Sequence, residues 1–304
     1  MEIRQIQYFL SLYEEGSMTK AANRLNVVQP AISMQLAKLE DELGQQLFLR
    51  NSKGMDPTPA GQQMYKLFRP LMGEFARARA MMRQADGIVG GHVAIGLIGS
   101  VAQDLLAQAL MDFTQSYPRV TLALSDGYTP ALCKAVTEGT LDAAIINKPR
   151  RRLSLNSLTV LTEDFVLATG LTHPPLEATI PLREVQNLKL VLPTRLHGLR
   201  DILDSVTQAE DIELTPALEV DSISTQLQLV EVSDYAALLP RIAVRSRELA
   251  GTLRLHAIRD PALIREVVCV THPRRILSLA AAAFIDVLKR QAKINATRAR
   301  PEVS

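Results

Sequence analysis

The sequence predicts a mixed fold in three parts: a small, mainly helical N-terminal domain, one long helix, and a C-terminal α/β domain with two lobes. Three changes in pattern along the chain support this prediction. Residues 1–58 contain short helical periods, residues 60–86 form one long helical period, and from His92 onward short β-branched runs alternate with helical stretches. The length of 304 residues also favours more than one domain.

The composition is that of a globular protein, with 47% hydrophobic and 22% charged residues. It excludes a mostly disordered chain, a collagen-like chain and a disulfide scaffold. The net charge of +2 is too small for bulk charge to indicate nucleic-acid binding, so any such binding must depend on where the charges lie. No apolar run approaches the ~20 residues that a membrane span needs. Cys133 and Cys269 are predicted to be reduced thiols, with a redox pair as a less favoured alternative, and we expect a cytoplasmic protein without membrane association.

Three short helices are expected in the first domain. Residues 6–13 place apolar side chains on one helical face, Ser17 can cap a second helix, and Gln29 and Pro30 begin a third. The predicted buried stripe of the third helix consists of Ile32, Leu36, Leu39 and Leu43. Two short helices joined by a turn, here from Met18 to Ala37, indicate a helix-turn-helix.

The outer face of the third helix carries the candidate DNA-binding side chains Pro30, Ser33, Met34 and Lys38, with Gln29 at its start. Small, hydroxyl and apolar groups on an exposed helix face suit entry into a major groove, where bases are read by hydrogen bonds and methyl contacts. An ordinary surface helix is the alternative interpretation.

A small hairpin, or wing, is predicted next. Residues 47–50 and 55–58 read as short strands around a turn at residues 51–54. Arg50 and Lys53 would lie at its tip and are further candidate DNA-binding residues.

The long helix is predicted to begin at Thr58 and Pro59, a capping hydroxyl followed by proline at the first helical position. Pro70 lies inside this helix and is expected to kink it. Apolar side chains recur at alternating spacings of four and three, at Met64, Phe68, Leu71, Phe75, Ala78, Met82 and Ala85. Such a heptad seam favours a partner helix, and packing against the helix's own domain is the alternative.

The remainder of the chain predicts an α/β domain. Strands over residues 93–98, 120–124 and 143–146 are separated by helices, an order typical of a parallel sheet. A second set is predicted as strands over 165–168, 188–192, 218–220 and 236–239, with helices over 199–206 and 223–232. A last strand over 265–270 and an apolar helix over 277–288 complete the domain.

A ligand cleft is expected between the two lobes, beyond the carboxyl ends of the strands. The candidate effector-binding residues are Ser100, Thr129, Asn147, Thr194, Arg195 and Ser222. Ser100 and Thr129 stand where helices begin, and helix N-termini favour anions, so a small organic acid is the predicted ligand. Plain helix capping explains each residue equally well, and a solvated loop explains Arg195.

The sequence does not favour an enzyme. The five histidines are scattered without metal-ligand spacing, and residues 96–100 match neither a dinucleotide fingerprint nor a phosphate loop. We therefore expect no catalytic residues, no metal site and no cofactor. A transport-type binding protein is the alternative from another class, because it would share the last two-thirds of the chain.

The motifs as a set resemble LysR-type transcriptional regulators. The resemblance rests on Met18–Ala22, Val28–Ser33, Leu39-Glu40, Leu43-Gly44, Leu47-Phe48, Arg50 and Thr58–Gly61. It extends over essentially the whole chain and implies an N-terminal winged helix-turn-helix (mainly α), a long dimerising linker helix, and a C-terminal two-lobed α/β domain of periplasmic-binding-protein type. Many members carry a basic or polar residue where this chain has Met34.

The resemblance implies a sequence-specific DNA-binding regulator controlled by a small, anionic metabolite bound between the lobes. The expected partners are double-stranded DNA, this effector, further copies of the chain as a homodimer assembling to a homotetramer, and RNA polymerase. The expected domains are 1–58 for DNA binding, 59–91 for the linker helix and hinge, and 92–304 for effector binding. Within the last, lobe I is expected over about 92–161 and 266–304, and lobe II over about 162–265.

Overall fold

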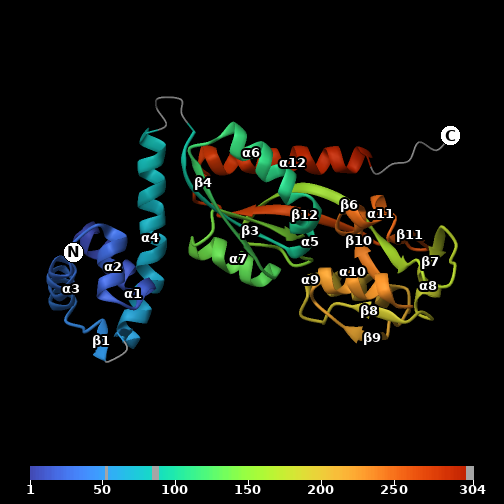
Figure 1. Cartoon of the computed structure of the whole chain (residues 1–304), viewed down its shortest axis with the longest axis horizontal. Coiled ribbons are helices and arrows are strands. Elements are labelled where there is room, and N and C mark those ends of the chain that lie inside the picture. The colour runs from blue at the N-terminus through green and yellow to red at the C-terminus, as the bar shows by residue number, and fades with distance from the viewer. Residues whose placement is uncertain (52–53, 84–88, 299–304) are drawn as a thin grey trace. The chain divides into compact units, whose positions relative to one another are not determined.

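The computed structural model describes residues 1–51, 54–83 and 89–298 (Figure 1). The chain divides into two compact units, residues 1–83 and residues 84–304. Among the described residues, no helix combines the length and apolar character that crossing a bilayer would require.

The first unit contains four helices and one hairpin among its described residues. Its elements are α1 (Ile3–Glu15), α2 (Met18–Leu25), α3 (Gln29–Leu43), β1 (Phe48–Asn51), β2 (Gly54–Pro57) and α4 (Pro59–Arg83). The Ser17 hydroxyl accepts the backbone N–H of Lys20 and caps α2 at 3.5 Å, as its sequence position predicts. The Thr58 hydroxyl likewise accepts the backbone N–H of Gly61 at 3.0 Å in the first turn of α4.

Packing around α1 forms the core of this unit. Phe9 and Leu12 of α1 are fully buried, together with Ile32 and Leu39 of the predicted α3 stripe. Leu43 was predicted to belong to this buried stripe but is 37% exposed, because it is the last residue of α3. Gly61 lets α4 approach this core, since a Cβ there would lie 2.2 Å from the Leu47 carbonyl oxygen. The close contact lets the first turn of α4 pack against the segment that leads into β1.

The two hairpin strands are antiparallel, with Arg50 opposite Met55. Arg50 is exposed, whereas Lys53 lies outside the described residues. The hairpin is tied to the end of α1, because the Met55 N–H donates to the Gly16 carbonyl oxygen at 3.0 Å.

The apolar seam of α4 splits into two parts. Met64 and Phe68 are 9% and 8% exposed and belong to the core of the first unit. Leu71, Phe75 and Met82 are 57%, 37% and 80% exposed. The helix is continuous from Pro59 to Arg83 with Pro70 inside it, and Ala85 lies outside the described residues.

The first lobe of the second unit is built on the strand order β4-β3-β5-β12-β6. Its strands are β3 (Gly91–Leu97), β4 (Val120–Asp126), β5 (Ala143–Asn147), β12 (Ile264–Thr271) and the first part of β6 (Asn156–Gly170). Its helices are α5 (Gly99–Asp104), α6 (Leu106–Ser116), α7 (Thr129–Glu138) and α12 (Leu279–Arg298). Strand β3 runs parallel to β4 and β5, as predicted, and α6 and α12 lie side by side on one face of the sheet (Figure 1).

The second lobe continues the same sheet through the last part of β6. Its other strands are β7 (Thr179–Pro181), β8 (Leu190–Leu192), β9 (Pro216–Glu219), β10 (Ala236–Pro240) and β11 (Leu253–Arg259). Its helices are α8 (Leu182–Val185), α9 (Gly198–Ala209), α10 (Ile223–Val232) and α11 (Arg241–Leu249). Each lobe has its own apolar core.

Strand β6 joins the lobes. It pairs with β12 over residues 156–164 and with β10 and β11 over residues 165–170. Only the second, apolar half of β6 was predicted from the sequence, because the first half is mostly exposed and contains no continuous apolar run. Helix α12 extends to Arg298 beyond its apolar period, and buried Gln291 donates a hydrogen bond to Asp112 of α6 there.

Candidate functional site

The exposed face of α3 carries the side chains expected there. Pro30, Ser33, Met34 and Lys38 are all exposed, and Met34 is 54% exposed. Between positions 29 and 39 the helix contains no acidic residue, so this end of α3 presents polar, apolar and basic groups without a carboxylate. Such a surface is compatible with a polyanion and with reading base edges from the start of the helix.

Gln29 is held at the start of this face. Its Nε2 donates to the Thr19 hydroxyl of α2 at 2.7 Å. The bond joins the two helices of the helix-turn-helix at their exposed side and orients the first side chain of α3.

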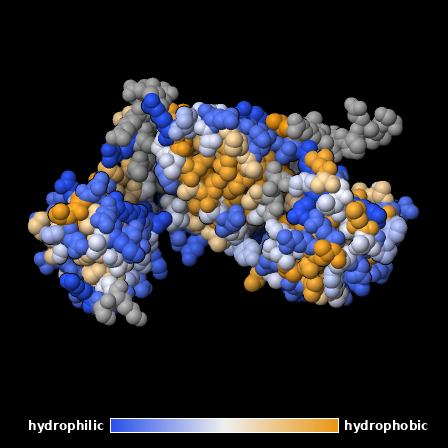
Figure 2. Space-filling view, in the orientation of Figure 1, coloured by the Kyte–Doolittle hydropathy of each residue, from blue (hydrophilic) through white to orange (hydrophobic). Residues whose placement is uncertain are grey.

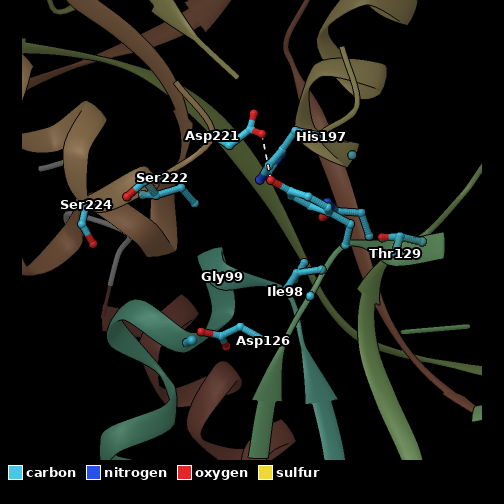
Figure 3. Close-up of a pocket in the computed structure, with 14 residues that line it drawn as sticks. Ile98, Gly99, Asp126, Thr129, His197, Asp221, Ser222 and Ser224 are labelled. Carbon is cyan, nitrogen blue, oxygen red and sulfur yellow. Dashed lines mark hydrogen bonds between the residues drawn. The ribbon is translucent and has the colours of Figure 1, made fainter. Parts of the chain in front are cut away.

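A pocket of about 510 Å³ lies between the two lobes of the second unit (Figure 3). The first lobe contributes lining residues from the ends of its parallel strands, and the second lobe contributes the segments before α9 and α10. The polar lining side chains are Asp126, Tyr128, Thr129, Asn147, His197, Asp221, Ser222 and Ser224. The pocket therefore lies where open α/β sheets bind ligands.

Three helices of ten or more residues begin in this lining. They are α7 at Thr129, α9 at Gly198 and α10 at Ile223. The first N–H groups of a helix have no intrahelical acceptor, and the helix dipole adds positive potential at the same end. The pocket thus receives positive potential from both lobes, although its lining contains no Lys or Arg.

Asp221 connects the lobes across the pocket. One carboxylate oxygen accepts the Tyr128 hydroxyl of the first lobe at 2.8 Å, and the other accepts the Thr194 N–H of the second lobe at 2.8 Å. Burial raises the pKa of Asp221, but these hydrogen bonds outweigh burial and hold the pKa below its usual value. Asp221 is therefore ionised at neutral pH.

His197 caps α9 beside this contact. Its Nδ1 accepts the Leu199 N–H at 3.1 Å, and its ring lies edge-on to Tyr128, with centroids 5.4 Å apart. Burial lowers the pKa of His197, so the imidazole is neutral at neutral pH. Because Nδ1 accepts a hydrogen bond, Nε2 carries the proton and is a hydrogen-bond donor.

Arg265 of β12 lies behind the pocket, and its side chain is fully buried. Its Nη1 donates to the Ser100 hydroxyl at 2.8 Å and to Asn147 Oδ1 at 3.0 Å, while its Nε donates to Glu163 at 2.8 Å. Desolvation lowers the pKa of Arg265, and Glu163 opposes that shift. Arg265 therefore fixes two of the predicted site residues in place.

The predicted effector-binding residues divide into three groups. Thr129, Asn147 and Ser222 line the pocket. Ser100 is 2% exposed and bonded to Arg265, outside the lining. Thr194 donates its backbone N–H to Asp221 and does not line the pocket. Arg195 is exposed and also lies outside the lining.

Sequence reasoning missed three charged residues of this region, Asp126, Asp221 and Arg265. Both aspartates could have been found from position, since Asp126 ends a strand and Asp221 precedes the residue that caps α10. Arg265 stands at the start of an apolar strand, a placement that indicates a buried partner. Over the described ranges, no cluster of three or more His, Cys, Asp and Glu residues could hold a metal ion.

Two family models match the chain. Residues 3–62 match the bacterial regulatory helix-turn-helix protein of the lysR family, and residues 87–293 match the LysR substrate binding domain. Among curated proteins, the HTH-type transcriptional regulator GltR of Bacillus subtilis is 28% identical over 289 residues, which cover 95% of this chain and 96% of GltR. The nitrogen assimilation regulatory protein nac of Escherichia coli is 28% identical over 291 residues, covering 95% of this chain and 94% of nac.

Solved structures share the fold over nearly the whole chain. A full-length OxyR variant of Pseudomonas aeruginosa matches with a TM-score of 0.73 at 23% identity, covering 97% of this chain and 95% of OxyR. Full-length CbnR in complex with its target DNA matches with a TM-score of 0.68 at 23% identity, covering 96% of this chain and 100% of CbnR.

Proposed function

Because the chain belongs to the LysR family of bacterial transcriptional regulators, we propose that it controls promoters in response to a small, anionic metabolite bound in the interlobe pocket. It is a DNA-binding transcriptional regulator with an effector-binding domain, and its relatives are regulators, not enzymes. The observation that carries the proposal is the convergence of α7, α9 and α10 on one pocket lined by both lobes.

Base reading is assigned to the exposed face of α3. Ser33 supplies a hydroxyl, Met34 an apolar surface and Lys38 a cation, groups that suit base edges, thymine methyls and phosphates respectively. Gln29 and Pro30 complete this face, and Arg50 and Lys53 of the hairpin are the proposed phosphate contacts. The DNA-binding domain is assigned to residues 1–58, the linker to 59–91 and the effector domain to 92–304.

The proposed assembly is a homodimer that forms a homotetramer. Exposed Leu71, Phe75 and Met82 on α4 support the first contact, because an apolar helix stripe is covered when two such helices pair. Figure 2 shows a hydrophobic area on the part of the second unit that holds β4 and α6. Met111 of α6 is 56% exposed. That area supports a second contact between copies.

Ligand binding is proposed to change how the lobes close. Thr129 and Asn147 belong to the first lobe, whereas His197 and Ser222 belong to the second, so a ligand that contacts both favours the closed form. Closure would then alter how the oligomer spaces its DNA-binding domains. RNA polymerase at the regulated promoter is the further proposed partner, and the cytoplasm, where DNA and polymerase reside in bacteria, is the proposed location.

Filling the pocket tests this function directly. A Cβ on Gly198 would lie 3.3 Å from Asn147 Nδ2 and 3.6 Å from the Thr129 hydroxyl, so Gly198→Leu places a side chain inside the pocket. An operator is first selected from random DNA duplexes with the wild type. The variant should bind this operator normally, but small acids that change the operator binding of the wild type should have no effect on the variant. Gln208→Leu, on the exposed last turn of α9, is the matched control. A full response in Gly198→Leu would show that the pocket is not the effector site.

A further inference from the structure

The charged side chains of the interlobe pocket narrow the class of acid that it can bind. Its lining contains two carboxylates, Asp126 and Asp221, one neutral imidazole at His197, and no Lys or Arg. An anion without a positive group would approach two carboxylates that no Lys or Arg of the lining neutralises. The ligand must therefore carry a positive group for the carboxylates as well as a negative group for the helix N-termini.

A separate part of the pocket is built from hydrogen-bond donors. Asn147 is 5% exposed, and its Oδ1 is taken by Arg265, so the amide Nδ2 is left to face the pocket. The Thr129 hydroxyl oxygen is buried and has no partner among the described residues. Both atoms flank the first residue of α9, Gly198, as the 3.3 and 3.6 Å approaches to its Cβ position show. Unsatisfied buried polar groups are costly, so these atoms indicate a missing polar ligand atom.

The two carboxylates differ in availability. Both oxygens of Asp221 already accept hydrogen bonds, from Tyr128 and Thr194. The Asp126 side chain has neither a hydrogen bond nor an ion pair within the part of the chain that the structure describes, although it lines the same pocket from the other lobe (Figure 3). Of the two carboxylates, Asp126 is thus the one without a partner among the described residues, and it can receive a cation.

We propose that the ligand of this pocket is a zwitterion of the amino-acid class. Its carboxylate lies between Thr129, Asn147 and the start of α9, and its ammonium group pairs with Asp126. Helix N-termini and amide donors favour the carboxylate, and a charge-assisted hydrogen bond to Asp126 selects the ammonium. This inference rests on the proposed function, because it names the chemical class of that effector.

Matched ligand pairs test the inference on the full-length protein. Each of the twenty common amino acids is compared, by calorimetry and thermal shift, with the acid that lacks its amino group, such as glutamate with glutarate and alanine with propionate. At least one amino acid should bind at least ten times more tightly than its matched acid, because hydrogen bonds to charged groups are worth about a factor of ten or more.

Two variants separate the ends of the ligand. Asp126→Asn should reduce the ratio of the two affinities, for the amino acid and for its matched acid, to about one. Glu213 is an exposed carboxylate outside the lining, so Glu213→Gln should preserve that ratio. Thr129→Val removes a hydroxyl that has no partner among the described residues, so the fold should persist. The affinities for the amino acid and for its matched acid should fall by the same factor.

The outcomes distinguish this inference from the proposed function. If the acids bind as tightly as the matched amino acids, the zwitterion inference is wrong. If Thr129→Val and Gly198→Leu also lower the affinity for those acids, an anionic effector in the pocket still stands. An unchanged ratio in Asp126→Asn, or no binding of any amino acid to the wild type, would also overturn the zwitterion inference. Only a full effector response in Gly198→Leu contradicts the proposed function.

Discussion

Arg265 and Glu163 stand directly opposite each other on β12 and β6, at the place where the sheet of one lobe continues into the other. The guanidinium also holds Ser100 and Asn147 of the first lobe, and the second carboxylate oxygen of Glu163 accepts the Ile242 N–H at the start of α11 at 2.7 Å. A single buried ion pair therefore joins the pocket, the lobe junction and a helix of the second lobe.

Arg265→Met should destabilise the effector domain strongly. It leaves the largely buried Glu163 without its cation, and breaking a buried pair on one side costs about 3–5 kcal/mol. Urea unfolding of the wild type and the variant measures the difference. The double variant Arg265→Met with Glu163→Gln should recover part of the loss, because no buried charge remains.

Lys189→Met is the matched control for that experiment, because Lys189 pairs with Asp234 at an exposed position. Its effect on stability should be much smaller, since surface ion pairs contribute little. Equal losses in Arg265→Met and Lys189→Met would contradict the role assigned to the buried pair.

The stability of the effector domain should fall as the pH decreases below the ordinary histidine pKa of about 6.5. Burial lowers the pKa of His197, so below pH 6.5 the unfolded chain binds a proton that the folded chain resists. Protonation also removes the Nδ1 acceptor that caps α9. Thermal unfolding between pH 5 and 8 should show this dependence in the wild type.

His197→Asn keeps a capping side chain and removes the titration, so its unfolding temperature should vary less over that pH range. The exposed His92→Asn variant should behave as the wild type. A pH dependence that survives in His197→Asn would assign the effect to another group.

The sequence predicted those elements whose signals are local. Ile32, Leu36 and Leu39 of the α3 stripe, the caps at Ser17 and Thr58 and the parallel strands of the first lobe follow from short-range sequence signals. The short strands β7 and β11 were missed because their exposed positions interrupt the apolar runs. Tertiary pairing, not propensity, determines them.

The pocket was predicted at the correct ends of the strands but with an incomplete set of residues. Strand position identified Thr129, Asn147 and Ser222, because residues after parallel strands gather at one edge. It could not show that Ser100 turns toward Arg265, since the two residues are 165 positions apart. Long-range partners of this kind leave no local pattern.

Base reading should depend on the outer face of α3. Ser33→Ala should weaken operator binding more than nonspecific binding, because the hydroxyl can bond to base edges. Met34→Arg should change the preferred bases within each half-site, because arginine favours guanine. Selection from random duplexes measures both effects. Unchanged sequence preference in both variants would remove these residues from the reading face.

Phe75→Glu should weaken the proposed dimer. Phe75 lies on α4 between exposed Leu71 and Met82, and a carboxylate there would be buried in the helix pair. Sedimentation should show dissociation, and affinity for an operator with two half-sites should fall. Arg79→Glu, at an exposed position outside the apolar seam, is the charge control. A Phe75→Glu dimer with normal operator affinity would show that α4 pairs through another face.

Tyr128→Phe should weaken effector binding without changing operator affinity in the absence of effector. It removes the hydrogen bond to Asp221 that joins the lobes, while the phenyl ring can keep its contact with His197. A hydrogen bond of this kind contributes about 0.5–1.5 kcal/mol, so ligand affinity should fall about two- to tenfold as the closed form loses population. Operator titrations with and without effector measure both quantities, and Tyr117→Phe, beside Phe113 in the first lobe, is the control. Ligand affinity equal to that of the wild type would mean that the Tyr128–Asp221 contact does not bias closure, because a bond can shift an equilibrium between two forms only if it is stronger in one of them.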